Sequence, residues 1–326
     1  MARGQRWFAY TNLIISLGVV AVVVWALLNR QGIIDWWRLQ SFKPSSEIML
    51  IANNDTMVGH GRDLFYASQP AIESGSAFNA NCVNNSEQSI VLGCYRAQSI
   101  YIFDVTDPRL DGVKEVTAAH EMLHAAYERM NEADKQHVNA LLDPIIKNMT
   151  DPRMLGLIQL YNKSEPGELY NEMHSILGTE VRNLSPELET YYQQYFSDRE
   201  KIVTYSENYE AVFSASKQRI SDMDSQLTAW KAQIDTNNDT LQRQQAQLAA
   251  ESQNLSALRS EGKTDEYNAA VPGYNQQVES FNTLVQQTKQ LIAQYNALVD
   301  TRNKEAAAQN NLYQSLDSRY QSVQAN

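Results

Sequence analysis

The chain has 326 residues, enough for one medium-sized domain and additional segments. Its formal net charge of −11 argues against nucleic acid as a partner, because binding to phosphates requires a basic face. The two cysteines are too few for a fold built on disulfides, and they lack the Cys-x-x-Cys spacing of a metal knuckle.

An apolar segment near the N-terminus predicts a membrane anchor. Residues Phe8 to Leu28 carry no charge, and a helix of this length spans about 30 Å, the hydrocarbon thickness of a bilayer. The alternative is a cleaved signal peptide, whose apolar region would be shorter and followed by a small-x-small cleavage site. We therefore predict an uncleaved transmembrane anchor over residues 1–30. Residues 31–44 are expected to lie along the membrane surface or to dock on the next domain.

The orientation of this anchor follows from two opposing signals. Slightly more basic residues follow the apolar segment than precede it, which favours a cytoplasmic C-terminal side. Cys82 and Cys94, in contrast, flank a polar loop that a disulfide could close. Such a disulfide would stabilise the fold by roughly 3 kcal/mol, and it would persist only outside the cytosol. We therefore expect a single-pass protein of the cell membrane with its main domain outside the cytoplasm.

Residues 45–188 are predicted to form an α+β domain. Glu47–Ala52 and Gln98–Val105 have the composition and the alternation of strands. Asp104 to Gly112 is rich in turn-forming residues and leads into a helix.

That helix contains the motif with the clearest chemistry. His120 to His124 reads H-E-x-x-H and lies among good helix formers. Residues four apart lie on the same face of a helix, so both imidazoles can bind one metal ion. Glu121 follows the first ligand directly and can hold a water molecule on that metal. The alternative is a chance pentapeptide on an ordinary surface helix.

A third metal ligand must come from elsewhere in the fold. A zinc site that performs hydrolysis has three protein ligands and one open position. The predicted helix from Glu168 to Glu180 is the best source, because it carries Glu168 and Glu172 four residues apart. Either glutamate could be the third ligand, and His174 and Glu180 are further alternatives on the same helix. The two spaced glutamates could also form a solvated helix face without any metal.

H-E-x-x-H followed by a glutamate-bearing helix resembles the gluzincin metallopeptidases, and the resemblance covers Val113 to Leu184. It implies a zincin-like fold with a small sheet and active-site helices, a Zn²⁺ cofactor and a peptide or protein substrate. The matching E-x-x-x-E spacing implies that Glu168 is the third ligand and that Glu172 orients a histidine. Tyr161 occupies a position where some members carry a tyrosine that stabilises the oxyanion.

Residues 189–326 are predicted to form a long α-helical coiled-coil hairpin. Apolar residues recur at steps of three and four from Ile220 to Ile234 and from Val278 to Val299, which is a heptad pattern. The segment from Ser260 to Gly273 contains proline and glycine and predicts the reversal between two helices. This arm could dock a protein partner, mediate self-association or serve as a spacer.

Two functions of different classes are consistent with these features. The first is a membrane-anchored zinc metallopeptidase that hydrolyses peptide bonds with a zinc-bound water and Glu121 as the general base. The alternative is a non-enzymatic scaffold or adaptor of the cell envelope, in which the metallopeptidase domain is degenerate and the coiled coil is the working part. The presence of all three motif residues, His120, Glu121 and His124, favours the metallopeptidase over the scaffold.

Overall fold

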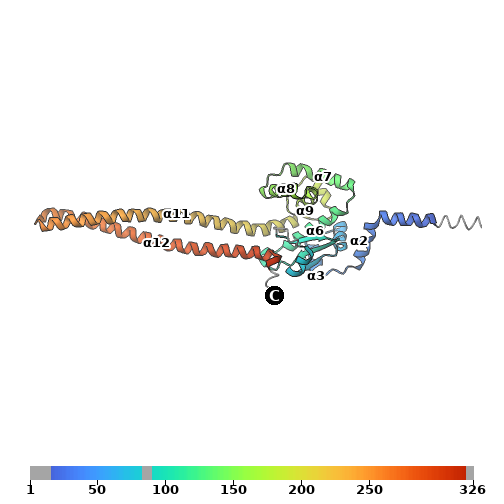
Figure 1. Ribbon diagram of the computed structural model, residues 1–326, viewed down its shortest axis with the longest axis horizontal. Coiled ribbons are helices and arrows are strands. Elements are labelled where there is room, and N and C mark those ends of the chain that lie inside the picture. Colours follow the sequence, from blue (N-terminus) through green and yellow to red (C-terminus); the bar gives the residue numbers. More distant parts are fainter. Residues whose placement is uncertain (1–15, 83–89, 321–326) are drawn as a thin grey trace, which may run out of the picture. The chain divides into compact units, whose positions relative to one another are not determined.

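The computed structural model describes residues 16–82 and 90–320 of the chain (Figure 1). The chain divides into two compact units. The first contains the described residues up to Val212 together with those from Tyr313 onward, and the second is Phe213–Leu312.

The α+β zincin fold expected from the sequence is wrong, because the described residues are mainly helical. The sheet that they contain has three short strands: Ala71–Glu73 (β1), Gly93–Arg96 (β2) and Ser99–Phe103 (β3). Their order is β1-β3-β2, with β1 parallel and β2 antiparallel to the central strand. Strands of this length cannot form the frame of the domain, and helices supply most of its core.

The segment Glu47–Ala52, predicted as a strand, belongs to the helix Ser46–Asn54 (α3). The Ser45 hydroxyl accepts a hydrogen bond from the backbone N–H of Ile48 at 3.2 Å and caps this helix. Ile48 and Ile51 are buried three residues apart, the spacing of one helical face. A short apolar run is compatible with a strand or a helix, and here the cap and the packing favour the helix.

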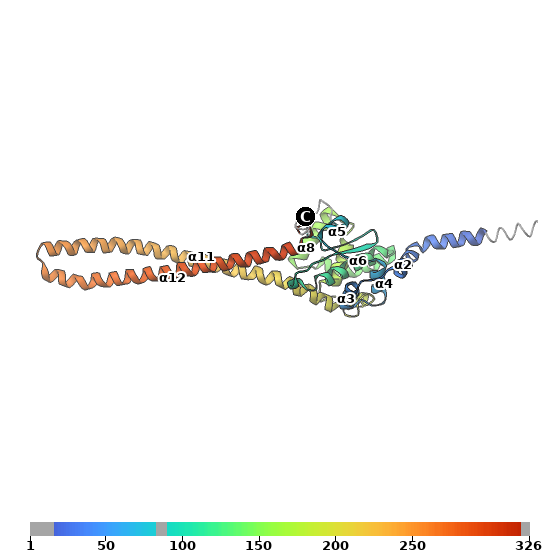
Figure 2. The same cartoon turned by 90° about the horizontal axis from the view of Figure 1, so that it is seen from below.

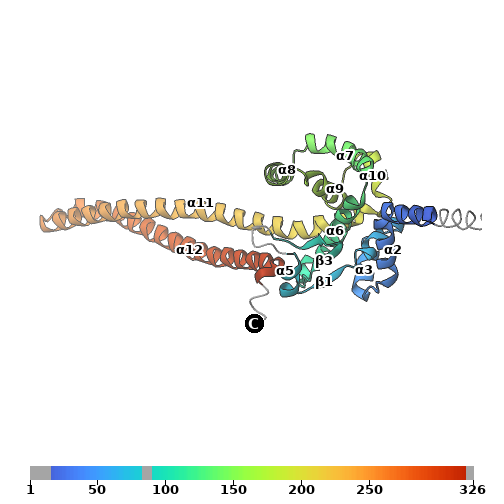
Figure 3. The ribbon, with the colours of Figure 1, turned by 45° about the vertical axis from the view of Figure 1, so that its right-hand side comes forward.

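The other helices of the first unit follow in chain order: Arg30–Ser41 (α2), Gly59–Ala67 (α4), Gly75–Cys82 (α5), Val113–Arg129 (α6), Glu132–Lys147 (α7), Pro152–Ser164 (α8), Leu169–Thr179 (α9) and Pro186–Tyr192 (α10). α6 lies between the sheet and α9 (Figure 3). α7 and α8 pack on α9, and α2 packs on α4 (Figure 2). The helix that carries H-E-x-x-H is therefore the central element of this unit.

The contact between α6 and α9 is close because a glycine leaves the required space. A Cβ atom at Gly178 of α9 would lie 2.3 Å from Cδ1 of Leu123 and 2.9 Å from Cε1 of Tyr192. Separations this short are excluded by sterics, so a side chain at this position would force the two helices apart. The approach of α9 to α6 thus depends on Gly178.

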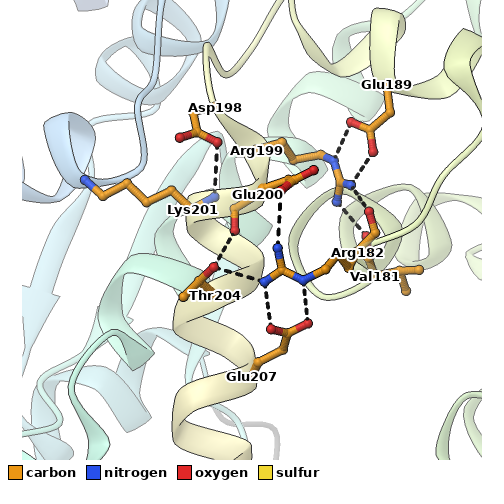
Figure 4. Close-up of polar contacts among 9 residues, drawn as sticks. All are labelled: Val181, Arg182, Glu189, Asp198, Arg199, Glu200, Lys201, Thr204 and Glu207. Atoms are coloured by element: carbon orange, nitrogen blue, oxygen red, sulfur yellow. Dashed lines mark hydrogen bonds and ion pairs between the residues drawn. The ribbon is translucent and has the colours of Figure 1, made fainter.

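The C-terminal end of α9 is held by Arg199, the first residue of Arg199–Ser260 (α11) (Figure 4). Its guanidinium donates hydrogen bonds to the carbonyl oxygens of Leu177 at 3.2 Å and Val181 at 2.7 Å. It also pairs with the carboxylate of Glu189 at 3.0 Å. The last carbonyl groups of a helix lack helical partners, and a cation near them satisfies and stabilises that end.

Cys82 and Cys94 form a disulfide, the pairing considered from the sequence. It joins the end of α5 to β2. Disulfides persist mainly in oxidising compartments outside the cytosol.

Among the described residues, no single helix is long and apolar enough to cross a membrane. The predicted span, Phe8 to Leu28, lies partly outside those residues, and its described part is the helix Ser16–Leu28. This helix and α2 meet the length and hydropathy criteria only as a pair, and they are bent by 73° relative to one another.

The second unit consists of parts of two long helices, α11 and Thr264–Leu316 (α12), which run side by side (Figure 1). Gly262, with φ of 71°, lies in the turn that joins them. The reversal is therefore tighter than expected, and Pro272 lies inside α12. The Asn237 amide donates a hydrogen bond to the hydroxyl of Thr288 at 3.1 Å, so polar side chains also contribute to the contact between these helices.

Candidate metal centre

α6 places His120 and His124 one turn apart on the same face. The residues around them on this helix are buried in the core, and Ala119, Met122 and Leu123 are fully enclosed. This packing immobilises the helix, whereas each of the two histidine side chains remains 17% exposed. The imidazoles are thus held firmly but stay accessible to solvent.

The two imidazoles meet one carboxylate, that of Glu172 in α9. The Nε2 atoms of His120 and His124 are 3.0 Å apart. Oxygen atoms of Glu172 lie 3.8 Å from Nε2 of His120 and 3.5 Å from Nε2 of His124. Two atoms bound at ~2.0–2.1 Å to one tetrahedral zinc ion are roughly 3.3 Å apart, a value that the observed separations bracket. These three side chains could therefore hold one ion.

Glu168, predicted as the third ligand, is not part of this group of described residues. It immediately precedes α9, and its exposed carboxylate accepts a hydrogen bond from the Asn171 amide at 3.0 Å. Glu172 lies one helical turn further along, a displacement of about 6 Å along the helix axis. The packing of α9 on α6 brings Glu172, rather than Glu168, level with the histidines, so Glu172 is the carboxylate that could complete a metal-binding group.

Asn171 and Tyr161 hold two of the three side chains in place. Oδ1 of Asn171 lies 2.9 Å from Nδ1 of His124, and the Tyr161 hydroxyl donates to Oε2 of Glu172 at 3.0 Å. A partner at Nδ1 leaves Nε2 as the atom that can bind a metal. The sequence drew attention to Tyr161 but not to Asn171, because the contact of Asn171 with His124 depends on how α9 packs.

His174, considered as an alternative ligand or a residue behind the ligands, is a core histidine. Its side chain is buried, and its Nε2 lies 2.8 Å from the Tyr191 hydroxyl. The rings of Tyr127 and Tyr192 also pack on it. Burial lowers the pKa of His174 to about 3, so the ring is neutral and serves the packing of α9.

Glu121 lies against β2 and is only 6% exposed. A Cβ atom at Gly93 would lie 2.9 Å from Cγ and 3.0 Å from Oε1 of Glu121, so only glycine leaves room for this carboxylate. The backbone N–H of Tyr95 donates a hydrogen bond to it. Burial raises the pKa of Glu121 to about 7, and nearby Glu172 contributes to the rise. A carboxyl group with a pKa near neutrality is suited to proton transfer. No sequence pattern pointed to Gly93 or Tyr95.

Charge interactions within the group set its protonation. Burial lowers the pKa of His124, but the hydrogen bond to Glu172 and the negative charges of Glu172 and Glu121 outweigh burial and raise it to about 9. Burial also raises the pKa of Glu172, but the hydrogen bond from His124, the charges of the two imidazoles and the hydrogen bond from Tyr161 together outweigh burial and lower that pKa to about 2. Burial lowers the pKa of His120 to about 4. At neutral pH, His124 and Glu172 form an ion pair beside a neutral His120.

Zinc binding is expected to release about one proton at pH 7 and to tighten as the pH rises toward 9. A metal requires neutral imidazole, and His124 must lose the proton that its raised pKa retains. His120 and Glu172 have lowered pKa values and are already deprotonated at pH 7. Affinity should therefore increase by up to about tenfold per pH unit below the pKa of His124. Calorimetric titrations in buffers of different ionisation enthalpy measure the proton release. An affinity that is constant from pH 6 to 8 would contradict this account.

Comparisons with known proteins identify no relative: no protein-family model, curated protein or solved structure matches the chain.

Proposed function

We propose that this protein is a zinc-dependent hydrolase of peptide bonds. The ligands would be His120, His124 and Glu172, with Glu121 as the general base. The observation that carries the proposal is the convergence of two imidazole nitrogens and one carboxylate, all within 4.8 Å of one another, on H-E-x-x-H and a second helix. The same ligand types underlie the resemblance of the sequence to gluzincins, although the fold expected from that resemblance is not found.

The donor set fits zinc in a site that performs hydrolysis. Two imidazoles and one carboxylate are typical zinc ligands, and three protein ligands leave a fourth position open. Structural zinc sites usually have four protein ligands, often including cysteine. Both cysteines of this chain are in the disulfide and are unavailable for a metal.

The surrounding residues have definable tasks in this proposal. Zinc, when bound, would polarise the carbonyl group of the substrate and make water more acidic, with a pKa near ~7. Glu121 would accept a proton from the attacking water and deliver it to the leaving amine. The Tyr95 N–H group holds the Glu121 carboxylate in position for this transfer. Asn171 keeps the His124 ring in its orientation.

Tyr161 supports the site through Glu172. Its hydroxyl donates to the ligand carboxylate and so limits the rotation of that side chain. Stabilisation of the developing oxyanion by the same hydroxyl stays a prediction.

The disulfide supports an extracytoplasmic location for this activity. Cys94 lies in β2 between Gly93 and Tyr95, the two residues that contact Glu121. The strand beside the proposed general base is thus covalently tied to α5, and this bond would be lost in a reducing compartment.

Zinc dependence is the direct test of the proposed function. The purified full chain should contain about one zinc ion per molecule, as three converging ligands imply, and should cleave members of a mixed peptide library. A chelator should abolish cleavage, and stoichiometric zinc should restore it. Magnesium should not restore cleavage, because it prefers oxygen ligands in octahedral geometry. Helical circular dichroism of the chelated protein controls for unfolding.

The possible negative outcomes have distinct meanings. A chain that neither contains zinc nor takes it up would overturn the metal site. If the chain binds zinc tightly but cleaves no peptide, the metal site would be supported and the hydrolase function would be overturned. The protein would then be the non-enzymatic scaffold, with zinc in a structural role.

A further inference from the structure

Charged side chains on one face of helix α2 hold it against the rest of the first unit. The Arg38 guanidinium donates to the carbonyl oxygen of Ala67 at 2.7 Å and to the hydroxyl of Ser99 at 2.8 Å. Both carboxylate oxygens of Asp35 accept hydrogen bonds from Arg129, each at 3.0 Å. Arg129 is the last residue of α6, the helix that carries the two histidines. Parallel Arg–carboxylate bonds of this kind fix orientation as well as distance.

The opposite face of α2 is apolar and exposed. Ile33, Trp36 and Trp37 are spaced three and four residues apart, so they lie on one side of the helix. Their exposed fractions are 40%, 63% and 64%. Two adjacent tryptophans in water would leave a large apolar area unburied, and such patches usually mark an interaction surface.

The helix that precedes α2 in the chain is also apolar and exposed. The helix Ser16–Leu28 exposes a series of large apolar side chains: Leu17, Val19, Val20, Val22, Val23, Val24, Trp25, Leu27 and Leu28. The chain then bends by 73° into α2. At the bend, the side-chain amide of Asn29 donates to the carbonyl oxygen of Trp25 at 2.8 Å and satisfies one end of the preceding helix.

The bend suits a segment that enters a bilayer and then follows its surface. If Ser16–Leu28 lies along the bilayer normal, an angle of 73° places α2 nearly in the membrane plane. Exposed basic residues lie at both ends of α2, since Arg30 is its first residue and Lys43 lies shortly after its last, and both could reach lipid phosphates. Tryptophan is favoured at headgroup depth, where its ring is partly buried and its N–H group stays hydrated.

We propose that α2 lies in the headgroup region of a lipid bilayer with Ile33, Trp36 and Trp37 turned toward the lipid. The occupant of this face is lipid rather than a protein, because the neighbouring helix Ser16–Leu28 also exposes large apolar side chains along its length. The Asp35–Arg129 pair then connects the membrane surface directly to the end of α6. This proposal does not depend on the hydrolase activity.

Tryptophan quenching by brominated lipid tests the proposal on the full chain, which has five tryptophans. The test protein has the other three replaced by phenylalanine, so that only Trp36 and Trp37 emit. In phosphatidylcholine vesicles that carry bromine close to the headgroups, we expect strong quenching and emission at shorter wavelength than in detergent-free buffer. A matched protein that retains only Trp230, in α11, should be quenched little by the same lipids.

Equal quenching of the two proteins, or none in either, would overturn the proposal. Unquenched Trp36 and Trp37 together with concentration-dependent self-association would assign the face to a second copy of the chain. Unquenched emission from a monomer would assign it to another protein. Either of these results excludes lipid as the occupant.

Discussion

Glu121→Gln is expected to lower peptide hydrolysis by at least about 10²–10⁴-fold, the usual contribution of a positioned proton-transfer group. Glutamine has the same shape and can still accept the hydrogen bond from the Tyr95 N–H group, but it cannot take up a proton at neutral pH. Glu121 does not belong to the group of converging ligands, so zinc content should be unchanged. The measurement compares cleavage rates of the wild type and the variant after both are matched for zinc.

Glu115→Gln is the matched control for this substitution. Glu115 lies in the first turn of the same helix, where its carboxylate accepts a hydrogen bond from the Asn54 amide at 3.0 Å. It is outside the metal group, so its variant should cleave peptides at the wild-type rate. If both variants retained full activity, Glu121 would have no part in the reaction.

Glu172→Gln is expected to weaken zinc binding more than Glu168→Gln. Loss of a residue that only holds a metal ligand in place typically lowers metal affinity by about 10- to 100-fold. Loss of a ligand itself should lower the affinity by more. Glu172 lies beside both histidines, whereas Glu168 reaches His124 only through Asn171. The two glutamates are four residues apart, which makes each variant the control for the other.

A competition titration against a chromophoric zinc chelator gives the two affinities under identical conditions. Both variants must first show the helical content of the wild type. A larger loss for Glu168→Gln would return the ligand role to Glu168 and would require α9 to shift along α6 when zinc binds.

The histidine pair and the long helices could be predicted from local sequence patterns. The spacing of His120 and His124 places them on one face of any helix, whatever surrounds it. The heptad patterns likewise indicated the long helices α11 and α12, because periodicity is a property of each segment alone. The pairing of Cys82 with Cys94 followed from the cysteine count, since the chain offers one possible pair.

Local patterns could not decide the class of the fold. The run Glu47–Ala52 is short and apolar, and it became a helix because Ser45 caps it and because one of its faces packs in the core. The sequence therefore predicted a strand where the structure has α3, and an α+β domain where the described residues are mainly helical.

The identity of the carboxylate beside the histidines, and the contacts that hold Glu121, depend on packing between elements distant in sequence. Glu168 and Glu172 are equivalent in the E-x-x-x-E pattern, and the choice depends on the level at which α9 crosses α6. That level is set by contacts between residues distant in sequence, such as Gly178 with Leu123 and Arg199 with the last turn of α9. In the same way, Gly93 meets Glu121 only because β2 packs against α6. A metal site needs positions accurate to a fraction of an ångström, and packing between elements supplies that accuracy.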